Sequence, residues 1–182
     1  MAHVLLGCQM LVAVVFAAAV VSKRPGKAFA EFTASTGRLL PPRLTGWRRP
    51  AARGVFAAEL TTVVLVAVPA TAAAGFALAA TLLTGFAVGI AGALRRGERT
   101  PCRCFGAASA RLGPAHLVRN LSLATVAAAG LVMASLASAG PTQPGPAAVA
   151  AVASLSGAAL VIRMDDLIAL FAPTSVSRSR RK

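Results

Sequence analysis

The 182-residue sequence has few acidic residues, few cysteines and few aromatic residues other than phenylalanine. It contains five Asp and Glu residues, three Cys, one Trp and no Tyr. Charged residues make up 13% of the chain, against about 25% in soluble domains, which argues against a water-soluble globular protein. Three unevenly spaced cysteines exclude the disulfide framework of small secreted domains. The hydrophobic fraction of 57% excludes intrinsic disorder.

The charges that are present are almost all positive. The chain has 19 Lys and Arg residues and a formal net charge of +14. Nucleic-acid binding is one source of such an excess, but no Tyr, a single Trp and no basic helix face speak against it. The positions of the basic residues must therefore explain their number.

Three long stretches, residues 1–22, 60–94 and 120–162, contain no charged residue. A helix needs about 20 apolar residues to cross the hydrocarbon core of a bilayer. In lipid every backbone polar group needs an internal partner, which favours helices for such stretches. The second and third stretches are too long for one crossing, and each is interrupted by proline, at Pro69 and at Pro141. The sequence therefore predicts an all-α polytopic membrane helical bundle.

We expect a single integral membrane domain over residues 1–172 and a basic cytoplasmic tail over residues 173–182. Five spans are expected, at about residues 4–21, 54–68, 75–94, 117–139 and 147–162. The second and fifth are short, so four spans with one interfacial helix are the alternative. No basic residue precedes the first apolar run, which indicates a retained helix and not a cleaved signal peptide.

Five crossings bring all basic residues to one side of the membrane, because they fall only within residues 23–53, 95–119 and 163–182. Loops rich in Lys and Arg stay in the cytoplasm. The pattern predicts a multi-pass protein of the inner (plasma) membrane with its N-terminus outside and its C-terminus in the cytoplasm. Lys23, at the end of the first span, is interpreted as a snorkelling anchor.

The segment that points most directly to chemistry is Cys102-Arg103-Cys104, in the basic loop after the third span. A thiolate is the reactive form of cysteine, and neighbouring cations such as Arg103 stabilise it. A disulfide between such close cysteines is strained and easily reduced. We predict a redox-active dithiol, with two incidental loop cysteines as the alternative. A zinc site needs about four ligands, whereas Cys102, Cys104 and His116 supply three, so no metal site is predicted.

Glu59 is the only acid within reach of a span, and an ionisable residue in a membrane segment needs a partner. Arg119 opens the fourth span on the same side, next to Asn120 and after His116. We therefore predict a Glu59–Arg119 pair close to the two loop cysteines. It would tie helices together, or alternatively handle protons. His116 is interpreted as a polar residue at a helix start.

At these residues the chain resembles the methylamine utilisation protein MauE family, within the broader MauE/DoxX-like group of small helical membrane proteins. The resemblance covers about residues 1–140, and its most specific part is C-x-C-F-G followed by H-x-x-R-N. The matching features are Phe16, Val21-Ser22-Lys23, Phe29, Leu39-Leu40-Pro41, Glu59, Cys102-Arg103-Cys104-Phe105-Gly106 and His116-Leu117-Val118-Arg119-Asn120-Leu121.

The resemblance implies a DoxX-like four-helix core with an added C-terminal helix. It also implies an accessory role in the maturation of an exported, disulfide-rich client such as the small subunit of methylamine dehydrogenase, beside a thioredoxin-like protein, MauD. No cofactor is evident in the sequence. The lipid bilayer is a further expected partner, and nucleic acid is not expected to be one. Two other functions stay open: a non-catalytic membrane scaffold that docks a partner through its basic loops, and a DoxX-like subunit that binds a quinone.

One tension remains in this interpretation. The predicted orientation places Cys102 and Cys104 in the cytoplasm, whereas protein disulfides form outside it. Either the pair accepts reducing equivalents on the inside, or its loop enters the membrane.

Overall fold

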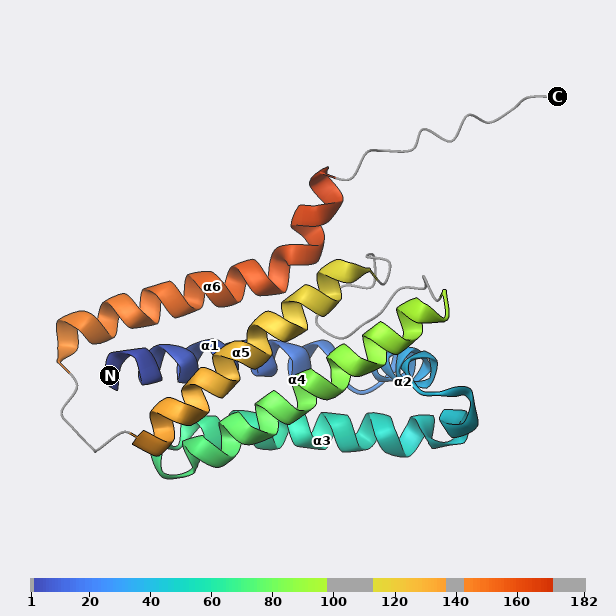
Figure 1. Ribbon diagram of the computed structural model, residues 1–182, viewed down its shortest axis with the longest axis horizontal. Coiled ribbons are helices and arrows are strands. Elements are labelled where there is room, and N and C mark those ends of the chain that lie inside the picture. The colour runs from blue at the N-terminus through green and yellow to red at the C-terminus, as the bar shows by residue number, and fades with distance from the viewer. Residues whose placement is uncertain (1, 98–112, 137–142, 172–182) are drawn as a thin grey trace.

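Figure 1 shows the computed structural model of the protein, in which residues 2–97, 113–136 and 143–171 are described. No strand occurs within these ranges, which confirms the predicted all-α polytopic membrane bundle. The elements are α1 (Ala2–Ser22), α2 (Lys27–Leu39), the 3₁₀ helix η1 (Pro42–Trp47), α3 (Arg48–Ala67), the 3₁₀ helix η2 (Pro69–Thr71), α4 (Ala72–Arg95), α5 (Pro114–Leu136) and α6 (Pro144–Phe171).

Five of these helices, α1, α3, α4, α5 and α6, are long and apolar enough to cross a membrane. They run alternately in opposite directions along the bundle (Figure 1). The protein is therefore a multi-pass membrane protein. The second and fifth predicted spans, which were short, correspond to longer helices in the structure, since α3 begins at Arg48 and α6 continues to Phe171.

Residues 23–53, expected to be a basic loop, contain the short helix α2. Gly26 precedes it with φ of 106°, a backbone conformation that favours glycine. Phe29, Phe32 and Thr36 follow at helical spacing, and Phe32 and Thr36 are buried. This amphipathic spacing was the signal in the sequence from which α2 could have been predicted.

The turn between α3 and α4 lies at Pro69, as the sequence predicts. Val68, directly before the proline, is extended, which is the conformation that proline imposes on its predecessor. The Thr71 hydroxyl donates to the Leu65 carbonyl at 2.9 Å and satisfies one of the carbonyls left open at the end of α3. The turn thereby folds α4 tightly back on α3.

The core lies where α4 meets α5 and where α1 meets α3 and α5. A Cβ atom on Gly130 of α5 would fall 2.5 Å from the buried ring of Phe76 in α4, so only glycine permits this approach. The largest buried apolar side chains are Phe16, Phe32, Phe76, Leu83, Ile90, Val12, Val15 and Val66.

The helix α6 packs beside α1 (Figure 1). The Ser154 hydroxyl of α6 lies 2.9 Å from the Gly7 carbonyl of α1 and 2.7 Å from the Ala150 carbonyl in its own helix. Several large apolar side chains of α6, such as Val149 and Val152, are exposed. In a membrane protein these side chains face lipid, so α6 is a peripheral helix attached mainly to α1.

The alternating helices bring several helix ends to one end of the bundle, which we call the basic end. It comprises the end of α1, all of α2, the start of α3, the end of α4, the start of α5 and the end of α6 (Figure 1). The described Lys and Arg residues all lie in these segments or in the residues directly next to them. The positive charge of the described residues thus lies at one end of the fold.

Candidate functional site

A buried ion pair joins α1 to α3 at the basic end. The Lys23 ammonium donates to both carboxylate oxygens of Glu59, at 2.6 Å and 2.8 Å. The side chains of Lys23 and Glu59 are 2% and 0% exposed. Hydrogen bonds between charged groups are the strong ones, and here both carboxylate oxygens are engaged. The intramembrane carboxylate that the sequence singled out therefore has a cationic partner.

An aromatic side chain from α2 covers this pair. The Lys23 ammonium lies 4.7 Å from the centre of the Phe32 ring, within range of a cation–π interaction. The Phe32 ring lies in turn 6.2 Å from the ring of Phe29. The helix α2 thus closes the ion pair off from solvent and completes a three-helix junction.

This geometry corrects one prediction and leaves another open. The interpretation of Lys23 as a snorkelling anchor is wrong, because α2 covers its ammonium and Glu59 binds it. The cationic partner of Glu59 is thus Lys23, which directly follows α1, a helix antiparallel to α3. The predicted contact between Glu59 and Arg119 stays a prediction.

The first two turns of α5 contribute three buried polar side chains. His116, Arg119 and Asn120 are 3%, 3% and 0% exposed. The Asn120 amide nitrogen donates to the His116 carbonyl at 2.7 Å, and the Asn120 Oδ1 atom has no hydrogen-bond partner in the described ranges. A buried acceptor of this kind is available to a donor from a bound group or an ordered water.

Cys102, Arg103 and Cys104 lie outside the described residues. Their segment follows α4, which ends at Arg95, and precedes α5, which begins at Pro114. Both of these helix ends belong to the basic end. The described residues contain no group of three His, Cys, Asp or Glu side chains that could hold a metal ion.

Cys8 lies far along the chain from the other two cysteines, near the start of α1. It is a half-buried free thiol that packs against the hydrophobic core. A cysteine in such a position behaves as a small apolar residue.

The family model for the methylamine utilisation protein MauE matches residues 1–133. The match includes α1 to α4, most of α5 and the Cys102–Cys104 segment, and it ends before α6. No curated protein and no solved structure matches the chain. Because the match covers well over half of its residues, the chain belongs to the MauE family of methylamine utilisation proteins.

Proposed function

We propose that this MauE-family membrane protein is a thiol-redox or maturation factor that supports disulfide formation or assembly of an exported partner. The observation that carries the proposal is the family match, which extends over both Cys102 and Cys104. The two cysteines, with Arg103 between them, lie in a segment flanked by helix ends of the basic end. Cations around a thiol favour the thiolate that thiol–disulfide exchange requires.

The proposed reaction is an exchange with a thioredoxin-like partner. One thiolate of the pair attacks the partner's disulfide, forms a mixed disulfide and releases one partner thiolate. The second thiolate of the pair then attacks the mixed disulfide and releases the other partner thiol. The Cys102–Cys104 pair is oxidised to a disulfide, and the partner's disulfide is reduced to two thiols. A second, reduced dithiol partner returns the pair to the dithiol by attacking the Cys102–Cys104 disulfide in the same two steps, and it leaves as a disulfide that can oxidise the client's thiols.

Replacing both loop cysteines tests this function. We expect Cys102→Ser/Cys104→Ser to abolish reversible oxidation of the protein and to leave the exported client without its disulfides. The first effect is measured by a gel shift with a maleimide reagent after acid trapping, and the second by the same shift on the client.

The matched control is Cys8→Ser, because Cys8 is a half-buried cysteine of α1 far along the chain from the pair. This variant is expected to retain client maturation. If the client matures normally in the double variant, the protein has no redox role, and a non-catalytic scaffold becomes the better interpretation.

The proposal includes an orientation, with the basic end in the cytoplasm. Basic segments stay inside, and all the described Lys and Arg residues belong to this end. We expect a membrane-impermeant maleimide to label Cys102 and Cys104 only after intact cells are permeabilised. A cysteine introduced as Gln143→Cys, at the exposed start of α6 on the opposite end, is expected to be labelled in intact cells. Labelling of Cys102 or Cys104 from outside would overturn the orientation.

A further inference from the structure

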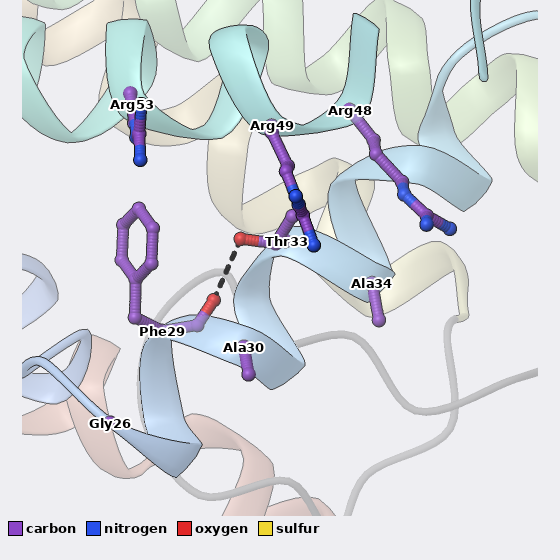
Figure 2. A pocket seen from close by; sticks show the side chains of 8 residues that line it. All are labelled: Gly26, Phe29, Ala30, Thr33, Ala34, Arg48, Arg49 and Arg53. Carbon is purple, nitrogen blue, oxygen red and sulfur yellow. Dashed lines mark hydrogen bonds between the residues drawn. The ribbon is translucent and has the colours of Figure 1, made fainter. Parts of the chain in front are cut away.

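A groove with a cationic wall lies between α2 and α3 at the basic end. Its volume is about 430 Å³, and its lining includes Gly26, Phe29 and Thr33 from the α2 side and Arg48, Arg49 and Arg53 from α3. Figure 2 shows the three arginine side chains extending from α3 toward α2, with Arg53 above the Phe29 ring and Arg49 above Thr33. The groove is separate from the buried Lys23–Glu59 pair.

The three guanidinium groups are available to an anion. All three arginines are exposed, and none forms an ion pair with a side chain in the described part of the protein. No acidic residue is among the described residues that line the groove. The arginines occupy the first two turns of α3, whose cap residue Trp47 makes no side-chain capping hydrogen bond. The partial positive charge of a helix start therefore adds to the charge of the three side chains.

The opposite wall of the groove is apolar. The Phe29 ring of α2 meets the Phe56 ring of α3 edge to face, with centroids 6.0 Å apart. The Thr33 hydroxyl donates to the Phe29 carbonyl at 2.9 Å, so its proton is already in use. A ligand of this groove must therefore combine an anionic group for the guanidiniums with an apolar part for the phenylalanine side.

The groove lies at the depth of a membrane interface. It adjoins the start of α3, where the membrane-spanning part of this helix begins. Trp47 and Leu44, which directly precede α3, are 65% and 45% exposed. Tryptophan is enriched at membrane–water interfaces, where its amphipathic ring lies among the headgroups. The anionic groups most abundant at this depth are lipid headgroups.

We propose that this groove binds the phosphodiester headgroup of an anionic phospholipid from the leaflet around the basic end. Guanidinium groups match phosphate oxygens in geometry and charge, and basic pockets beside membrane helices recognise anionic headgroups. The first acyl carbons lie along Phe29. This contact orients α2 on the membrane surface, and α2 in turn covers the Lys23–Glu59 pair.

The test uses Trp47, the only tryptophan of the chain, as a reporter next to Arg48. The full-length protein is placed in nanodiscs of phosphatidylcholine with increasing fractions of a dibrominated lipid, either phosphatidylglycerol or phosphatidylcholine. Brominated acyl chains quench tryptophan fluorescence on contact. We expect brominated phosphatidylglycerol to quench Trp47 at a much lower mole fraction than brominated phosphatidylcholine does.

Two triple variants with the same change in net charge separate a groove from general surface charge. Arg48→Gln/Arg49→Gln/Arg53→Gln removes the cationic wall, and Arg24→Gln/Arg38→Gln/Arg43→Gln removes three exposed arginines that do not line the groove. Because only the three groove guanidiniums are proposed to bind the phosphate oxygens directly, the groove variant is expected to lose at least about tenfold in phosphatidylglycerol preference. The control variant is expected to lose much less, and equal losses would overturn the proposal.

A competition arm separates a lipid from a soluble anion. Excess inorganic phosphate at constant ionic strength is expected to leave the phosphatidylglycerol preference unchanged. If phosphate abolishes it, the groove binds soluble phosphate groups and the lipid assignment is wrong. Because the replaced side chains are exposed, both triple variants are expected to keep the helix content of the original protein by circular dichroism.

Discussion

Lys23→Met is expected to lower the free energy of unfolding by about 3–5 kcal/mol, because removing one partner of a buried ion pair leaves the other charge uncompensated. The Lys23 ammonium is within 2.8 Å of both Glu59 oxygens, and both side chains are almost fully buried. Methionine keeps a similar length and fills the space under Phe32. The loss is measured by unfolding the purified protein in mixed detergent micelles with increasing dodecyl sulfate, following Trp47 fluorescence.

Two further variants show whether the lost charge or the lost packing is responsible. Lys23→Met/Glu59→Met replaces the whole pair by apolar side chains, which is often neutral or stabilising, and it is expected to recover most of the stability. Arg163→Met breaks an exposed pair, in which the guanidinium lies 3.4 Å from Asp166 and both side chains are more than half exposed. Its effect is expected to stay below about 1 kcal/mol. A double variant as unstable as Lys23→Met would contradict the charge explanation.

From the sequence we could predict that Glu59 needs a cationic partner, but not that Lys23 is this partner. Glu59 was singled out because a carboxylate in a membrane segment requires compensation. Lys23 follows an apolar run directly, and in that position a lysine normally extends to the interface. What changes its role is α2, whose Phe32 covers the ammonium. A contact that joins three helices cannot be predicted from the local sequence, although the spacing of Phe29 and Phe32 could have indicated an amphipathic helix where a loop was expected.

The positions at which two helices approach each other closely were equally hard to predict from the sequence. Small residues four apart, such as Gly85 and Gly89 in α4, form a pattern that is common where membrane helices pack closely. A Cβ atom on Gly85 would meet nothing within 4 Å, and one on Gly89 would make only ordinary contact with Leu39. The closest approaches in the described part of the structure are instead at Gly75 of α4 and Gly130 of α5. The pattern identifies small residues, but the face that a helix turns to its neighbour depends on the whole bundle.

Gly75→Ala is expected to destabilise the protein by about 3 kcal/mol, at the upper end of the usual cost of overpacking. A Cβ atom at Gly75 would lie 2.6 Å from Val66 Cγ2 and 2.7 Å from the Val66 backbone nitrogen. It would also lie 3.0 Å from the Leu65 carbonyl carbon. Backbone atoms at the end of α3 cannot rotate away as a side chain can, so relief requires the α3–α4 turn to open. The same detergent unfolding titration measures the loss.

Gly85→Ala, in the same helix, is the matched control and is expected to have the opposite sign. Its Cβ atom would enter open space, and alanine favours a helix interior over glycine by up to about 1 kcal/mol. The two substitutions are chemically identical and both lie within α4, so a general effect of alanine on helix propensity would stabilise both variants. A loss confined to Gly75→Ala therefore assigns the cost to the contact with α3. Equal effects of the two substitutions would contradict the close approach of α4 to Val66.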